Sequence, residues 1–318
     1  MSDPSLSYSY VLMTYNQAET VKEAVESALS QDCAPLEIVI TDDCSADATF
    51  DVIEKTVAGY SGPHRVILNR NAQNLGLAGN IERAHQISSG DVIIVAAGDD
   101  MSLPHRCARL MQAFATGDPL LVCSYAQVIG PDGETVPGNF RTAAFYHSTD
   151  VQRAARAKAL YIGATGAWRR ALYDKYGPLD RDTYEDLVLG FRAALEGRVG
   201  VIGEELVKYR LGQGLTSSDM YHADLEAFAA HRERSFIANR AIMRQRIRDA
   251  GLFGVPEHSP VWAILKREEI KAALGVSFYQ EERSAFARRA LKTPLLGLHT
   301  WYAEARRRRK MQRRLHKG

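Results

Sequence analysis

The chain has 318 residues, of which 46% are hydrophobic and 25% charged, and its formal net charge is +2. This composition is typical of a globular protein and excludes a disordered or fibrous chain. No stretch approaches 18 consecutive apolar residues, and the opening MSDPSLSYSYVLMTYN has no basic or apolar leader region, so we expect neither a membrane-spanning helix nor a signal peptide.

Apolar runs and helical repeats alternate along the first hundred residues. Residues 9–15 are predicted to form a strand, and residues 17–31 a helix, because apolar side chains recur there at helical spacing. The alternation favours a doubly wound, mostly parallel α/β sheet, and the unbroken apolar strands indicate that both of its faces are covered. Further strands are predicted at 36–43, 64–69 and 92–97, and further helices at 48–60 and near 80–88.

The pattern is less regular after about residue 117. A β-prone run at 120–130 precedes helices near 151–160, 168–176 and 184–196, and a short strand is expected near 206–210. From residue 219 onward the chain is predicted to be helical and is increasingly basic. The four cysteines, Cys33, Cys44, Cys107 and Cys123, form no CxxC pair, which predicts free thiols in a reducing cytosol.

Three polar clusters follow predicted strands, at residues 14–16, 42–43 and 99–100. In open parallel sheets, ligands bind beyond the carboxyl ends of the strands. The clusters are therefore expected to lie together at the mouth of a ligand cleft. The glycines of the following loop, NLGLAGN at 74–80, would allow the backbone to approach a ligand closely.

Asp99 and Asp100 form a pair of adjacent carboxylates with two possible interpretations. They can bind Mg²⁺ or Mn²⁺, which prefer oxygen ligands and share them with substrate phosphates. Alternatively, Asp100 caps a helix that starts immediately after it. Asp42 or Asp43 is expected to face the cleft, where a carboxylate can bond a nucleobase edge or a ribose hydroxyl.

Seven stretches together resemble the inverting family 2 glycosyltransferases, which have the GT-A fold. They run in the family's order across about residues 9–218. The matching stretches are MTYN (13–16), SALSQ (27–31), EIVITDDCSADAT (37–49), NLGLAGN (74–80), SGDVIIVAAGDDMSLPHR (89–106), GPLDRDTYEDLVLGFRAALEG (177–197) and KYRLGQGLTSS (208–218).

The resemblance assigns roles to individual residues. Asp43 would contact the nucleotide base, Asp100 would ligate a metal that bridges the diphosphate, and Asp186 would be the general base. Asp99 would contact the ribose or the metal shell. The complete set is catalytic Asp186 and Glu185, metal-ligating Asp100 and Asp99, and nucleotide-binding Thr14, Tyr15, Asn16, Asp43, Asn74, Gly76, Asp99 and Arg210.

The chain departs from the family pattern at three positions. Ala97 or Gly98 stands where the first Asp of the DxD motif is usual, Gly212 stands where a His often follows the YR pair, and Leu179 replaces an aromatic residue. These departures put strict metal dependence and one diphosphate contact in doubt.

The activity implied by the resemblance is inverting transfer of a sugar from a nucleoside diphosphate, expected to be UDP. The acceptor would be a hydroxyl of a glycan or lipid-linked glycan of the O-antigen, capsule or exopolysaccharide type, and Mn²⁺ or Mg²⁺ would be the cofactor. The implied organisation is a GT-A domain at 1–218, with a nucleotide-binding half at 1–117 and an acceptor half at 118–218, followed by a helical extension at 219–318. Two alternatives stay open: transfer to a polyprenyl phosphate, and a non-catalytic module that binds a nucleotide sugar or a membrane.

Some residues have a structural interpretation beside the functional one. Glu185 and Asp186 would also suit a solvated first turn of a helix, where the helix dipole favours acids. Arg192 can contact the diphosphate or pair with an acid, and Trp168 can stack on an acceptor sugar or pack in the core. His85 and His105, both expected on helices, are interpreted as structural.

The C-terminal tail concentrates the positive charge. Residues 306–318 hold eight Lys and Arg and no acid, so the rest of the chain carries 32 basic and 38 acidic residues and is near −6. Together with the apolar residues of 295–315, this pattern is typical of a helix that lies on an anionic membrane. We expect a cytoplasmic protein held peripherally on the inner face of the membrane. A solvated tail is the alternative, and no nucleic-acid partner is expected.

Overall fold

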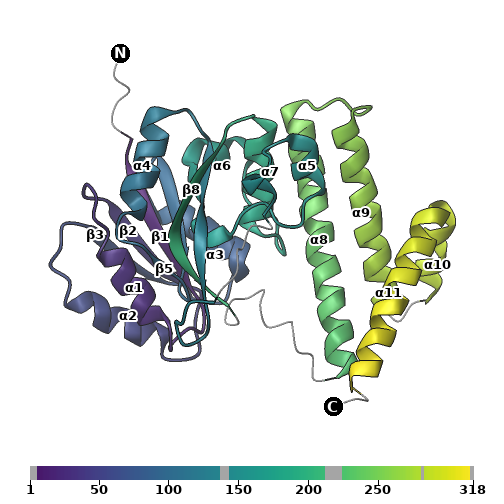
Figure 1. The fold of residues 1–318 in the computed structure, drawn as a ribbon, viewed down its shortest axis with the longest axis horizontal. Helices are drawn as coiled ribbons and strands as arrows, with labels where there is room; N and C mark the ends of the chain where they lie inside the picture. Colours follow the sequence, from purple (N-terminus) through teal and green to yellow (C-terminus); the bar gives the residue numbers. More distant parts are fainter. Residues whose placement is uncertain (1–5, 137–142, 212–223, 281–282, 316–318) are drawn as a thin grey trace. The chain divides into compact units, whose positions relative to one another are not determined.

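The computed structural model describes residues 6–136, 143–211, 224–280 and 283–315 (Figure 1). The chain divides into two compact units, residues 1–214 and 215–318, each of which is described separately below. The boundary predicted from the sequence, after residue 218, lies outside the described residues.

The N-terminal unit contains an eight-stranded mixed sheet with the strand order β3-β2-β1-β4-β7-β6-β8-β5. Its first half is a parallel, doubly wound arrangement, as the alternating sequence pattern predicted. The elements of this half are β1 (Tyr8–Thr14), α1 (Val21–Leu29), β2 (Glu37–Asp42), α2 (Thr49–Ala58), β3 (Arg65–Arg70), α3 (Gly76–Ile87) and β4 (Val92–Ala97).

The second half of the unit adds shorter and antiparallel strands. β7 runs antiparallel to both β4 and β6, so β6 points in the same direction as β4, and β8 is parallel to β6. The elements are β5 (Met101–Ser102), α4 (Arg106–Thr116), β6 (Leu121–Ile129), η1 (Ala144–Tyr146), α5 (Val151–Arg156), η2 (Gly163–Thr165), β7 (Ala167–Arg169), α6 (Arg170–Tyr176), α7 (Glu185–Leu195) and β8 (Val199–Arg210).

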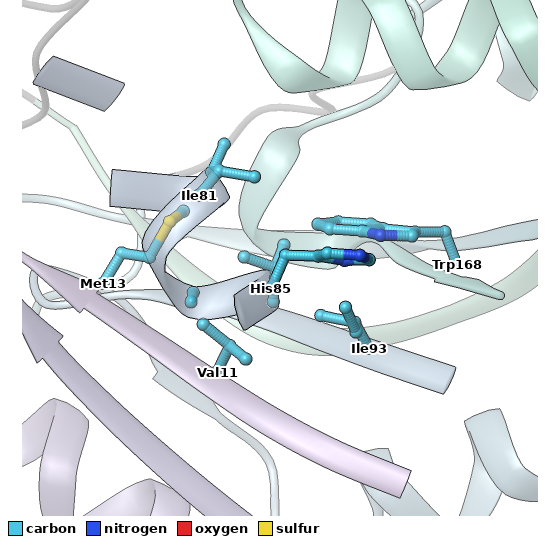
Figure 2. A pocket seen from close by; sticks show the side chains of 8 residues that line it. Val11, Met13, Ile81, His85, Ile93 and Trp168 are labelled. Atoms are coloured by element: carbon cyan, nitrogen blue, oxygen red, sulfur yellow. The ribbon is translucent and has the colours of Figure 1, made fainter. Parts of the chain in front are cut away.

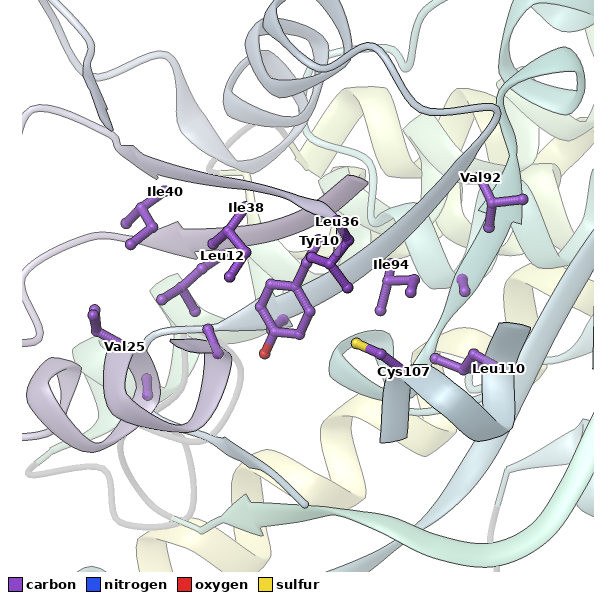
Figure 3. Close-up of a cluster of buried hydrophobic side chains, with 14 of the residues drawn as sticks. Tyr10, Leu12, Val25, Leu36, Ile38, Ile40, Val92, Ile94, Cys107 and Leu110 are labelled. Carbon is purple, nitrogen blue, oxygen red and sulfur yellow. The ribbon is translucent and has the colours of Figure 1, made fainter. Parts of the chain in front are cut away.

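Successive side chains of the central strands cover opposite faces of the sheet. Tyr10 and Leu12 of β1 pack with α1, α2 and α4 in the main buried cluster (Figure 3). Val11 and Met13 of the same strand face α3 on the other side (Figure 2). Because β1 is buried on both faces, it carries an unbroken apolar run, as the sequence indicated.

Several predicted elements differ in extent from those observed. The helix expected near 80–88 begins earlier, at Gly76, and the one expected over 151–160 ends at Arg156. Trp168 was placed in a helix, but it lies in β7 because this segment pairs with β4 and β6. The strand expected at 206–210 begins at Val199. The four cysteines are free, as expected.

The C-terminal unit is helical. It contains α8 (Leu225–Phe253), α9 (Pro260–Tyr279), α10 (Arg283–Lys292) and α11 (Pro294–Leu315), and α9 contacts each of the other three. Glu304 of α11 is buried and accepts hydrogen bonds from Arg232 of α8 and Tyr279 of α9. Among the described residues, no helix has the length and apolar character that a membrane span requires.

Candidate functional site

Asp99 and Asp100 lie directly beyond the carboxyl end of β4 and are 5% and 4% exposed. Asp100 Oδ1 accepts a hydrogen bond of 2.8 Å from the backbone N–H of Arg210, the last residue of β8. The Arg210 Nε donates to the Asp99 carbonyl oxygen at 3.0 Å. The helix-cap interpretation of Asp100 is wrong, because α4 begins only at Arg106 and β5 intervenes.

Two buried arginines hold the polypeptide around this pair. Arg106 donates to the Val95 carbonyl oxygen of β4 at 2.7 Å and to Ser102 Oγ at 2.8 Å. The Arg210 side chain donates to Glu23 Oε2 at 2.6 Å and to the Pro131 carbonyl oxygen at 2.6 Å. Arg210 was predicted to bind the nucleotide; in this structure its guanidinium bonds protein groups that surround the acid pair.

The electrostatics of the pair favour the binding of a positive charge. Burial raises the pKa of Asp100 well above its usual range, and the neighbouring charge of Asp99 raises it further. Burial also raises the pKa of Asp99. Arg106 and Arg210 oppose the shift of Asp100, and Arg210 opposes that of Asp99, but neither shift is cancelled. Ionising both carboxylates here is therefore costly unless a cation is close.

The donor set fits a hard divalent cation that shares its ligands with a substrate. Carboxylate oxygens are the ligands that Mg²⁺ and Mn²⁺ prefer, and such ions often use only one or two protein carboxylates. Within the described ranges, no group of three or more His, Cys, Asp or Glu side chains forms a closed metal cage. A cation at Asp99 and Asp100 would therefore take its remaining ligands from water or from a ligand's phosphates.

Gly98 is one of the two positions where the first Asp of the family motif is usual, and it has little space around it. A Cβ atom at this position would lie 2.5 Å from Gln17 Oε1 and 2.9 Å from Thr14 Cγ2. The Gly98 backbone N–H donates to the Met13 carbonyl oxygen at 2.9 Å. The end of β4 is thus packed against the end of β1, and a side chain at Gly98 would require Gln17 and Thr14 to shift.

The ends of β1 and β2 form the neighbouring part of the site. Thr14 Oγ1 donates to Asp42 Oδ1 at 3.1 Å, while Asn16 donates from its backbone to Ser45 Oγ and accepts from the Ala46 backbone N–H. Asn16 has a φ of 50°, a left-handed conformation that asparagine tolerates. Tyr15, which follows Thr14 in the chain, is partly exposed.

Asp43 is buried between this turn and the loop that precedes α3. Its Oδ1 accepts hydrogen bonds from Asn71 Nδ2 at 2.9 Å and from the Leu75 backbone at 2.8 Å. Among the described residues both bonds fall on Oδ1, which leaves Oδ2 for a ligand. Asn74 Oδ1 accepts from the Gly76 backbone, and Gly76 has a φ of +72°, which glycine adopts without strain.

The second acid pair, Glu185 and Asp186, occupies the first turn of α7. Glu185 is 6% exposed, and burial raises the pKa of its carboxyl. A Cβ atom at Gly163 would lie only 2.2 Å from Glu185 Oε1, so the carboxylate rests against the backbone of η2. Asp186 is partly exposed, and its Oδ1 accepts from the Leu187 backbone N–H.

Both acid pairs lie at the same edge of the sheet. The Val95 N–H of β4 donates to the carbonyl oxygen of Gly166, the residue between η2 and β7. Because β7 is antiparallel to β4, the η2 turn lies beyond the carboxyl end of β4, beside the segment that leads to Asp99. The Glu185 carboxylate, which lies against η2, is therefore at this edge as well.

The structure also places the four remaining residues that the sequence analysis singled out. Trp168 is 2% exposed, so it packs in the core and does not stack on a sugar. Together with His85 it lines an apolar cavity between α3 and the sheet (Figure 2). The cavity has a volume of about 10 Å³, which is room for one water molecule. Arg192 is buried and donates to the Gly177 carbonyl oxygen at 2.9 Å. His105 directly precedes α4 and is not part of it.

Sequence reasoning missed the support that Arg106 and Gln17 give to the acid pair. Arg106 is the last residue of the SLPHR match, which was a usable signal for it. Gln17, in the loop after β1, interacts with the Asp99 carboxylate and opposes the rise in its pKa, and nothing in its local sequence distinguishes it.

We expect Asp100→Asn to stabilise the metal-free protein at neutral pH. The raised folded-state pKa means that the folded protein binds the proton more tightly than the unfolded chain, so wild-type stability falls as pH rises above the unfolded value of about 3.9. Asparagine keeps the acceptor for the Arg210 N–H and removes the charge. Thermal unfolding in EDTA should show a higher Tm for the variant at pH 8 and a smaller difference near pH 4.

Asp132→Asn is the matched control, because this residue is exposed and its substitution should leave Tm unchanged. A lower Tm for Asp100→Asn than for wild type at pH 8 would contradict the electrostatic account.

Comparison with known proteins connects this geometry to a family. The model of glycosyl transferase family 2 matches residues 9–177. An uncharacterized glycosyltransferase of Nostoc sp. is 25% identical over 217 residues, covering 64% of each chain. The succinoglycan biosynthesis protein ExoO of Rhizobium meliloti is 32% identical over 128 residues, covering 40% of this chain and 35% of that protein. The chain thus spans less than two thirds of the length of these relatives.

Solved structures share the fold at low sequence identity. The S. aureus TarS fragment 1–349 in complex with UDP-GlcNAc has a TM-score of 0.55 at 16% identity, covering 89% of both chains. The mannosyltransferase PcManGT of Pyrobaculum calidifontis, solved with GDP-Man and Mn²⁺, has a TM-score of 0.60 at 17% identity, covering 91% of this chain and 80% of that one. The family match covers more than half of the chain, and the fold agrees with it: this chain belongs to glycosyltransferase family 2.

Proposed function

We propose that the protein is an inverting glycosyltransferase that moves a sugar from a nucleoside diphosphate, expected to be UDP, to a hydroxyl of a glycan or lipid-linked glycan. The observation that supports this best is the meeting of two acid pairs at one edge of the sheet, where only Asp186 of the four residues is not buried. Asp99 and Asp100 follow β4, and Glu185 and Asp186 begin α7. Such transfer needs one site that neutralises the leaving group and another that accepts a proton.

The first acid pair suits the leaving group. Negative charge develops on the diphosphate as the bond to the sugar breaks. Asp100, with Asp99, would hold Mn²⁺ or Mg²⁺, which would supply a Lewis acid for that charge. We propose that the nucleotide binds beside this pair, at the adjoining ends of β1 and β2 and the loop before α3. The residues there are Asp43, Thr14, Tyr15, Asn16, Asn74 and Gly76.

The second acid pair suits the acceptor. The acceptor hydroxyl must lose its proton as it attacks the anomeric carbon, and a carboxylate within about 3 Å can take that proton. Asp186 is the partly exposed member of the pair, whereas Glu185 is buried with a raised pKa. We therefore assign the base to Asp186. Attack from the side opposite the diphosphate inverts the anomeric centre.

The acceptor class rests on relatives and on the tail. One relative is named as a polysaccharide biosynthesis protein. In α11, Leu295, Leu298, Trp301 and Tyr302 are 84%, 66%, 48% and 64% exposed, and the basic run that follows them is exposed as well. Apolar side chains next to exposed arginines are complementary to an anionic membrane, where lipid-linked acceptors lie. We therefore propose a cytoplasmic, peripheral location.

A nucleotide titration tests the donor site. We expect one of UDP, GDP and dTDP to bind in calorimetry, more weakly in EDTA than with Mn²⁺. The reason is that Asp100 and Asp99 would hold the cation, which would supply positive charge for the diphosphate. The Asp100→Asn variant should bind the nucleotide with the same affinity in EDTA and in Mn²⁺. The Asp132→Asn variant should bind more tightly in Mn²⁺, as wild type does. Absence of binding for all three nucleotides by the folded wild type would overturn the proposed function.

Substitution of the base separates the two acceptor classes. Asp186→Asn is expected to lower kcat about 10²- to 10⁴-fold for a hydroxyl acceptor, with donor affinity unchanged, because the proton loses its acceptor. A polyprenyl phosphate is already ionised and needs no base. An unchanged kcat for Asp186→Asn would therefore favour that alternative, and nucleotide binding without turnover in wild type would identify a non-catalytic module.

Removal of residues 306–318 is expected to reduce sedimentation with anionic vesicles. Each basic residue near such a surface contributes about 1 kcal/mol at most, so the loss of eight should be large. The measurement compares phosphatidylglycerol-containing vesicles with pure phosphatidylcholine vesicles at two salt concentrations. Equal sedimentation of the truncated and full-length chains with the anionic vesicles would contradict the proposed membrane binding.

A further inference from the structure

The segment between α5 and β7 carries a buried hydroxyl that none of the roles above uses. Tyr161 is 2% exposed, and its Oη has no hydrogen-bond partner among the described residues. A buried polar atom without a partner costs stability, so its persistence calls for an explanation.

The ring that carries this hydroxyl is held in place from several sides. The Phe145 ring stacks on it, with centroids 6.3 Å apart and planes 8° apart. A Cβ atom at Gly166 would lie 2.6 Å from Tyr161 Cε2, so only glycine fits there. The hydroxyl is thus fixed in space by packing.

The same segment lies against the acid pair of α7. Gly163, two residues after Tyr161, has no room for a Cβ atom because Glu185 Oε1 would lie 2.2 Å from it. The two glycines of the GATG stretch therefore allow a phenol and a carboxylate to approach the same turn. Burial raises the pKa of the Tyr161 hydroxyl, and the charges of Glu185 and Asp186 raise it further. The hydroxyl therefore stays protonated, and toward a carboxylate it can act only as a hydrogen-bond donor.

Of the other ionisable groups that act on this hydroxyl, Cys123 of β6 stays neutral, because burial raises the pKa of its thiol to about 12. Tyr146 of η1 is nearby in sequence and already donates to the Ser124 carbonyl oxygen at 2.9 Å. Among the groups whose charges act on this hydroxyl, the acid pair at the start of α7 is the one that can accept its hydrogen bond as an anion.

We propose that Tyr161 is a positioning residue for the acceptor base: in the substrate-bound enzyme its hydroxyl donates to a carboxylate oxygen of the Glu185–Asp186 pair and keeps the base ionised. This inference rests on the proposed function. A hydrogen bond donated to the charged form of a carboxyl lowers its pKa. The bond would satisfy the orphaned hydroxyl and hold the carboxylate in a single orientation.

The test is Tyr161→Phe, assayed by release of nucleoside diphosphate from UDP-GlcNAc, UDP-glucose and GDP-mannose with water as acceptor. We expect kcat to fall about tenfold, the equivalent of one hydrogen bond to a charged group. The acidic limb of the pH profile should move up by about one pH unit, because the base loses a donor. Nucleotide affinity should be unchanged, and Tm should not fall, because an unpaired buried hydroxyl has been removed.

Tyr146→Phe is the matched control, because its hydroxyl has a backbone partner. This variant should lose stability and keep the pH profile of wild type. An acidic limb that does not move in Tyr161→Phe would overturn the role of Tyr161. Failure of the proposed function is seen separately, as the absence of nucleotide binding by wild type in the titration.

Discussion

The burial of two adjacent carboxylates beyond β4 is the constraint on which the rest of the site depends. Asp99 and Asp100 lie almost out of solvent, so the protein must supply donors and positive charge around them. Arg210 supplies a backbone N–H to Asp100 and a guanidinium to the Asp99 carbonyl oxygen, and Arg106 joins β4 to the segment that follows the pair. These contacts fix β8 and α4 relative to β4. The acid pair is therefore held in position before any ligand arrives.

The arginines do not remove the electrostatic cost of the pair, and this residual cost is informative. The pKa of Asp100 stays well above its usual range despite two guanidinium groups. A site that served stability alone would gain from an uncharged residue there, since unpaired buried charge destabilises the fold. Strained electrostatics of this kind concentrate at functional sites, where a ligand supplies the missing charge. The surrounding fold tolerates that cost because the parallel half of the sheet is well packed on both faces.

The part of the site around Glu185, where we propose that the acceptor binds, depends on close packing against the backbone. Gly163 and Gly166 are required by space and not by a left-handed backbone, because Glu185 and Tyr161 occupy the volume that their side chains would fill. The result is a buried cluster beside the end of β4, followed in the chain by one partly exposed carboxylate, that of Asp186. The partly exposed carboxylate of such a pair is accessible to a substrate proton, whereas the buried carboxylate packs against the protein backbone.

The parallel half of the fold, the family and the position of the two candidate acid pairs could be predicted from the sequence alone. An unbroken apolar run such as VIIVAA indicates a strand that is buried on both faces. The carboxyl ends of parallel strands lie at one edge of the sheet, so residues that follow such strands lie near one another. The tertiary structure decided what depends on side chains distant in the chain: that Asp100 is no helix cap, that Trp168 is in a strand, and that Arg210 binds protein groups. The limited space at Gly98 could not be predicted from sequence, because it is set in part by Gln17, more than eighty residues earlier. Contacts of this kind come from packing between strands, which no local pattern encodes.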